Sequence, residues 1–150
     1  MPLSDRAAQV AGLYQEMILD HYRRPRNKGD LAGADASVTM KNPLCGDEIV
    51  LNVAFDGDTI RDLTFSGRGC SISQASASMM TQLIKGQSTA EIDALKTRFR
   101  AMVMGDATAA DDTTLGSLRA LSGVAKFPAR VKCALLAWNA LETVLERRQA

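Results

Sequence analysis

The chain has 150 residues, of which 46% are hydrophobic and 23% charged, and its formal net charge is +1. This length and composition predict a single domain over residues 1–150 with a hydrophobic core of its own. The near-neutral charge argues against a nucleic-acid partner, and no apolar run is long enough to cross a membrane.

The first predicted element is an amphipathic helix over residues 4–22, whose apolar residues recur at helical spacing. Asp5 and Arg6 interrupt the N-terminus before a signal-peptide core could form, so we expect a cytoplasmic protein. Pro25 ends the helix within a basic cluster over residues 23–28, which is either a solvated helix end or a docking patch for an acidic partner surface. His21, the only histidine, is expected at the surface or against a partner.

Three strands are predicted next, at about 37–41, 49–55 and 59–66, because apolar and polar residues alternate along them. Asp56-Gly57-Asp58 has the chemistry of a hairpin turn between the second strand and the third. The apolar residues of the third strand change parity, since Ile60 is even and Leu63 and Phe65 are odd. This change predicts a bulge or a late start of the strand.

A second helix is predicted after Gly67-Arg68-Gly69-Cys70. The two glycines allow a close approach of the backbone to another group, and Ser71 or Ser73 can cap the helix. Cys70 would lie at the helix N-terminus, where the dipole favours the thiolate. The helix also carries a face of small residues, Ser73, Ser76, Ala77 and Ser78, which is either exposed or a surface on which another element packs.

The C-terminal half contains two clear helix starts. Ser88–Glu91 is a capping box, and Pro128 stands in the first turn of the last helix. Between these helices, residues 105–117 are expected to form a mobile loop, followed by a short helix at 118–121. Cys133 falls off the apolar stripe of the last helix and shares a flank with Arg130, three residues away.

The sequence from Asn42 to Asp47 contains the most informative turn of the chain. Pro43 and Gly46 make it tight, so that Cys45 and Asp47 can point to one place. An odd number of cysteines in a cytoplasmic chain argues against a disulfide framework, although the three could be unrelated buried thiols. We favour the hypothesis that Cys45, Asp47, Cys70 and Cys133 bind one zinc ion, with Arg68 or Arg130 balancing the excess negative charge.

Four segments together resemble the U-type iron–sulfur cluster assembly family, which includes the IscU proteins and the N-terminal part of NifU. They are Leu13–Asn27, Asn42–Asp47, Gly67–Cys70 with its serine-rich helix, and Arg130–Cys133. Lys132 stands where the shorter scaffold branch has a histidine, and the chain is longer between Cys70 and Cys133. In both departures the chain resembles the SufU-type branch, which consists of zinc-dependent sulfurtransferases.

The resemblance implies an α+β fold, a small three-stranded antiparallel sheet with helices packed against it. It also implies zinc ligation by Cys45, Asp47, Cys70 and Cys133, and a pyridoxal-phosphate-dependent, SufS-like cysteine desulfurase as partner. Cys45 would leave the zinc when the partner supplies a substitute ligand and would then take over persulfide sulfur. Arg130 would orient the transfer or stabilise the thiolate, and downstream iron–sulfur scaffold proteins would receive the sulfur.

Two alternatives remain open at this point. The chain could be a scaffold that assembles and transfers an iron–sulfur cluster, which would then be a transient cofactor. It could also be a binding module with a purely structural zinc site. The absence of a histidine next to Cys133 counts against the scaffold.

Overall fold

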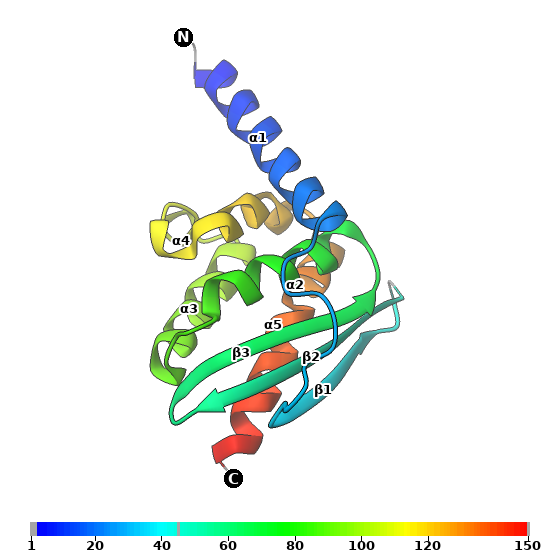
Figure 1. Ribbon diagram of the computed structural model, residues 1–150. Helices are drawn as coiled ribbons and strands as arrows, with labels where there is room; N and C mark the ends of the chain where they lie inside the picture. Colours follow the sequence, from blue (N-terminus) through cyan, green and yellow to red (C-terminus); the bar gives the residue numbers. More distant parts are fainter. Residues whose placement is uncertain (1–2, 45, 150) are drawn as a thin grey trace.

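The computed structural model describes residues 3–44 and 46–149. In chain order its elements are α1 (Leu3–Arg23), β1 (Ala36–Asn42), β2 (Asp47–Asp56), β3 (Thr59–Arg68), α2 (Ser71–Ile84), α3 (Thr89–Val103), α4 (Ala107–Ala110), the 3-10 helix η1 (Thr113–Lys126) and α5 (Pro128–Gln149). They form an α+β fold in which helices pack against a three-stranded antiparallel sheet, as predicted (Figure 1). None of the described helices combines the length and apolarity needed to cross a membrane.

The sheet has the strand order β1-β2-β3, and one of its faces is buried. Ile49, Leu51 and Val53 of β2 are completely buried, whereas the residues between them are partly exposed. The register between β2 and β3 shifts after Ala54, where the pairing leaves one extra residue on β3. This shift is the bulge that the parity change predicts, and it keeps the apolar residues of β3 on the core side.

Helix α2 lies at the centre of the helical layer, between α1 and α5 (Figure 1). Its small residues Ser73, Ser76 and Ser78 are fully buried, so this face is a packing surface and not an exposed one. The Ser76 hydroxyl donates a hydrogen bond of 2.6 Å to the backbone oxygen of Ala134 in α5. Small side chains on α2 therefore let its neighbours approach closely while their hydroxyls remain hydrogen-bonded.

His21 is buried, which corrects the prediction of a surface or partner contact. Its side chain is 5% exposed, and Nδ1 lies 2.8 Å from the hydroxyl of Ser78. The same hydroxyl accepts a hydrogen bond from the backbone N–H of Arg26, so Ser78 fixes both the end of α1 and the segment after it. The prediction rested on the neighbouring basic residues, which suggested an exposed segment. Arg24 and Arg26 instead pair with Asp20, while His21 points into the protein.

The predicted loop at residues 105–117 is wrong, because this stretch contains α4 and the start of η1. Its acidic residues act as helix caps. Asp106 accepts a hydrogen bond from the backbone N–H of Ala109, and Asp112 accepts one from that of Thr114. Ala109 and Leu115 are completely buried, so both side chains anchor the segment to the core.

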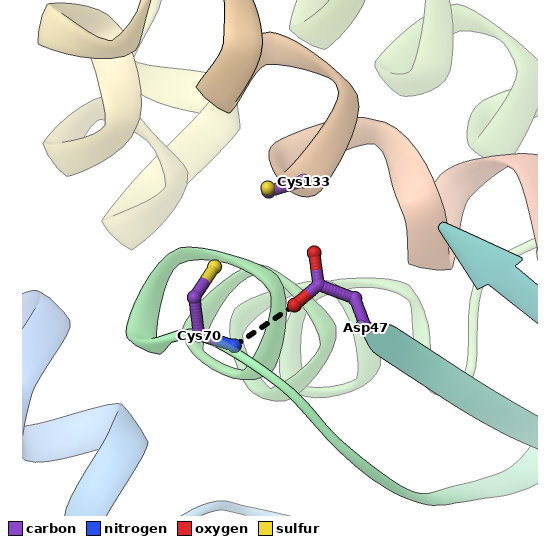
Figure 2. Close-up of side chains that lie close together, drawn as sticks. All are labelled: Asp47, Cys70 and Cys133. Atoms are coloured by element: carbon purple, nitrogen blue, oxygen red, sulfur yellow. Dashed lines mark hydrogen bonds between the residues drawn. The ribbon is translucent and has the colours of Figure 1, made fainter. Parts of the chain in front are cut away.

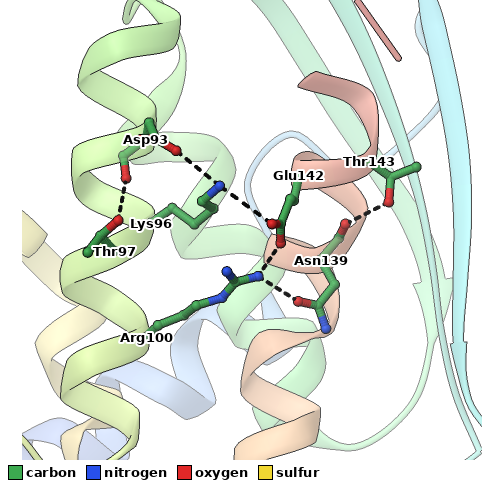
Figure 3. Close-up of polar contacts among 7 residues, drawn as sticks. All are labelled: Asp93, Lys96, Thr97, Arg100, Asn139, Glu142 and Thr143. Atoms are coloured by element: carbon green, nitrogen blue, oxygen red, sulfur yellow. Dashed lines mark hydrogen bonds and ion pairs between the residues drawn. The ribbon is translucent and has the colours of Figure 1, made fainter. Parts of the chain in front are cut away.

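Helix α3 begins with the predicted capping box of Ser88 and Glu91 and packs beside α5. A polar cluster joins the two helices, and Glu142 of α5 lies at its centre (Figure 3). Glu142 accepts a hydrogen bond from Arg100 and forms an ion pair with Lys96 at 3.8 Å. The contact with Arg100 is the main reason why the pKa of Glu142 lies below its ordinary value. This cluster fixes α5, whose N-terminal turns carry Cys133.

Candidate metal centre

Asp47 is the first residue of β2 and pairs with Asn42, the last residue of β1. The chain reverses between them, with Gly46 in the left-handed region at a φ of 69°. Asp47 is only 2% exposed, so the turn directs a carboxylate into the protein. Cys45, the predicted ligand in this turn, lies outside the described residues.

Cys70 reaches Asp47 because Gly69 allows a very close approach. A Cβ atom at Gly69 would lie 2.2 Å from Asp47 Oδ1, and the φ of 149° is also one that favours glycine. The backbone N–H of Cys70 donates a hydrogen bond of 2.9 Å to Asp47 Oδ1. The paired glycines predicted a close approach of the backbone to another group, and that group is the carboxylate of Asp47.

The prediction that Ser71 or Ser73 caps α2 is wrong, because Cys70 is itself the N-cap residue and makes no side-chain capping bond. Asp47, from a different element, accepts the Cys70 amide instead. The Ser73 hydroxyl points back to the carbonyl oxygen of Cys70 at 3.1 Å and lies 3.9 Å from its sulfur. The N-terminal turn of α2 is thus organised around Cys70 and Asp47.

Cys133 lies in the N-terminal part of α5 and is completely buried. The side-chain amide of Asn42 approaches its sulfur at 3.9 Å, and the sulfur lies 3.8 Å from the carbonyl oxygen of Ala129. Asn42 therefore connects the end of β1 to the thiol of α5. Sequence reasoning placed Asn42 in the turn but gave it no role, because the contact depends on how α5 crosses the sheet.

The ligand atoms of Asp47, Cys70 and Cys133 all lie within 4.8 Å of one another. Figure 2 shows the two sulfurs and one carboxylate oxygen at the corners of a triangle, while the other carboxylate oxygen bonds to the Cys70 amide. Atoms at this spacing can bind one small ion at their common centre. The structure thus brings together three of the four predicted ligands, from the start of β2, the N-cap of α2 and the N-terminal part of α5.

These residues fit a zinc ion. The second carboxylate oxygen of Asp47, Oδ2, is buried and has no hydrogen-bond partner among the described residues. A buried carboxylate oxygen without a partner is costly, and coordination of a cation would remove that cost. Thiolates and a carboxylate are ligands that zinc accepts, in a tetrahedral set of four.

Arg130 interacts with both cysteines of this cluster. It is exposed, and its pKa is raised above the ordinary value by the charge of Cys70 and then by a hydrogen bond and the charge of Cys133. Arg68, the other arginine considered for charge balance, has an 82% exposed side chain that pairs with Glu48 at 3.7 Å. Of the two, Arg130 is therefore the one placed to interact with both thiols.

Comparisons with known proteins agree with this arrangement. A family model described as the NifU-like N terminal domain matches residues 13–134. The chain is 50% identical to the zinc-dependent sulfurtransferase SufU of Bacillus subtilis (strain 168), over 90% of each chain. It is 48% identical to the iron–sulfur cluster assembly scaffold protein IscU of Streptococcus pyogenes serotype M1, over 90% of this chain and 84% of the relative.

The fold is also found among solved structures. The crystal structure of a hypothetical protein superposes with a TM-score of 0.84 at 47% identity, covering 90% of this chain and 98% of that one. Sequence motifs, fold and family model all agree over most of the chain. The chain therefore belongs to the family of the NifU-like N-terminal domain.

Proposed function

We propose that this protein is a zinc-dependent sulfurtransferase that accepts persulfide sulfur from a pyridoxal-phosphate-dependent cysteine desulfurase for iron–sulfur cluster assembly. Two features of the candidate metal centre carry the proposal. The ligand atoms of Asp47, Cys70 and Cys133 lie close together, and Oδ2 of Asp47 is buried without a hydrogen-bond partner among the described residues. The 50% identity to a protein named as a zinc-dependent sulfurtransferase supports the proposal.

In this proposal Asp47, Cys70 and Cys133 hold zinc together with Cys45. Bound zinc keeps coordinated thiols deprotonated at neutral pH. Asp47 and Cys133 are buried, and the Cys70 backbone is fixed by its bond to Asp47, so these three residues form the rigid part of the site. Cys45 lies in the sequence between β1 and β2, outside the described residues, and is the ligand that we assign to the reaction.

The reaction is an exchange at sulfur. The Cys45 thiolate attacks the terminal sulfur of the persulfide on the partner's cysteine, and a new bond forms between that sulfur and Cys45. The old bond between the two sulfurs of the partner breaks, and the partner's cysteine leaves as a thiolate. Arg130, next to the thiols, stabilises the negative charge on sulfur during the exchange. A downstream scaffold protein then receives the sulfur.

The test is sulfur transfer from a purified cysteine desulfurase supplied with radiolabelled cysteine. Cys45→Ala should abolish labelling of this protein, whereas Ser37→Ala, on an exposed part of β1, should leave labelling unchanged. Undiminished labelling of Cys45→Ala would overturn the proposal. If that variant lost only stability, the site would be a structural zinc site.

A second candidate function is assembly of an iron–sulfur cluster on this chain. The 48% identity to a protein named as a cluster assembly scaffold favours it. Reconstitution with iron and sulfide would then give a visible absorption band that can be transferred to an apo-protein. Lys132, at the position where the scaffold branch has a histidine, is exposed beside Asn42 and Leu44 and offers no comparable ligand.

A further inference from the structure

An open groove runs between α1, the start of α2 and η1. It consists of two cavities of about 720 and 510 Å³. The cavities are continuous because they have five lining residues in common, which are Ile18, Ser71, Ile72, Ala120 and Gly123. The groove extends from Val10 on α1 to Arg130 at the start of α5.

One end of the groove reaches the candidate metal centre. Ser71, which lines both cavities, directly follows Cys70, and Arg130 lines the second cavity while it interacts with the thiols of Cys70 and Cys133. A chain segment in the groove would therefore end beside the residues that we assign to sulfur acceptance. The groove is thus a part of the surface that a persulfide donor has to approach.

The chemistry of the groove indicates what it binds. Most of its lining is apolar, and large apolar side chains remain exposed along it, with Phe127 62% and Val10 47% exposed. The charged lining residues are Lys126 and Arg130, and none of the described residues that line either cavity is acidic. Exposed apolar side chains gathered in one concave place are typical of a protein-binding surface.

We propose that this groove binds a segment of the persulfide donor that carries both apolar and acidic side chains. The apolar side chains would bury the exposed lining, and a carboxylate would pair with Lys126. The inference rests on the proposed function, because the donor is the cysteine desulfurase of that proposal. Docking in the groove holds the donor in register with the metal centre, so the groove determines affinity for the donor and not the chemistry at sulfur.

Two glycines allow a matched test. Gly123 lines both cavities, and a Cβ atom added there would meet nothing within 4 Å, so we expect the larger side chain of Gly123→Leu to occupy space in the groove. Gly12 on α1 is equally open but lines neither cavity, which makes Gly12→Leu the control. A third variant, Lys126→Glu, places a negative charge in the groove.

The measurements are the dissociation constant for the purified cysteine desulfurase, by titration calorimetry at two salt concentrations, and sulfur acceptance from a small-molecule persulfide. Gly123→Leu and Lys126→Glu should each weaken binding of the desulfurase roughly tenfold or more. Added salt should weaken binding of the unmodified protein more than that of Lys126→Glu. Gly12→Leu should bind as the unmodified protein does, and all variants should accept sulfur from the small persulfide equally well.

Unchanged desulfurase affinity in Gly123→Leu would overturn the inference and leave the proposed function intact. The inference would also be wrong if Gly123→Leu only converted a dimer of this chain into a monomer, because a second copy would then occupy the groove. If the unmodified protein accepted sulfur neither from the desulfurase nor from the small persulfide, the proposed function would be refuted.

Discussion

Gly69 is the residue on which the approach of Cys70 to Asp47 depends most directly. In Gly69→Ala the new Cβ atom would lie 2.2 Å from Asp47 Oδ1 and 2.8 Å from Ser73 Oγ, so the carboxylate has to move. The hydrogen bond from the Cys70 amide to Asp47 is then lost, and such a bond to a charged group contributes about 1.5–3 kcal/mol. The φ of 149° is unfavourable for alanine and costs about 1–3 kcal/mol more.

We therefore expect the free energy of unfolding of metal-free Gly69→Ala to fall by about 2.5–6 kcal/mol in urea denaturation. Zinc affinity should fall roughly 10- to 100-fold in competition with a chromophoric chelator, because Asp47 is displaced. Gly33→Ala is the control, since Gly33 has a φ of 76° but open space around its Cα. That variant should show only backbone strain. Wild-type zinc affinity in Gly69→Ala would refute the role of Asp47 as a ligand.

Three further predictions concern residues around the site and the core. Asn42→Ala removes the amide next to the Cys133 sulfur and should speed zinc release to a chelator roughly tenfold, and an unchanged rate would argue against this contact. Burial lowers the pKa of His21 below its ordinary value of 6.5, so the unfolded state binds the proton more readily than the folded state. The free energy of unfolding, measured by urea denaturation, should therefore fall as the pH drops below about 6.5. His21→Gln should remove this pH dependence, since the chain has no other histidine. Arg130→Ala should slow sulfur acceptance, whereas Arg68→Ala should not.

Features that depend on local sequence were predictable. The parity change between Ile60 and Leu63 indicates the bulge, because alternation along a strand determines which face each residue joins. The capping box at Ser88 and the start of α5 at Pro128 follow from the chemistry of helix N-termini. The paired glycines before Cys70 likewise indicate a close contact, although not its partner.

Features that depend on tertiary packing were not predictable. The serines of α2 are buried because α1 and α5 cover them, and the same contacts bury His21. Residues 105–117 fold into short helices because Leu115 is buried in the core and because Asp106 and Asp112 cap the helix N-termini. The contact of Asn42 with Cys133 depends on how the sheet meets α5, which no local pattern encodes.

X-ray absorption at the zinc edge of the purified protein tests the central claim most directly. We predict one bound zinc per chain with three sulfur ligands at about 2.3 Å and one oxygen ligand at about 2.0–2.2 Å. The sulfur count should drop by one in Cys45→Ser, in Cys70→Ser and in Cys133→Ser, and the oxygen shell should change in Asp47→Ala. A zinc shell without sulfur, or one that none of these substitutions alters, would contradict the account.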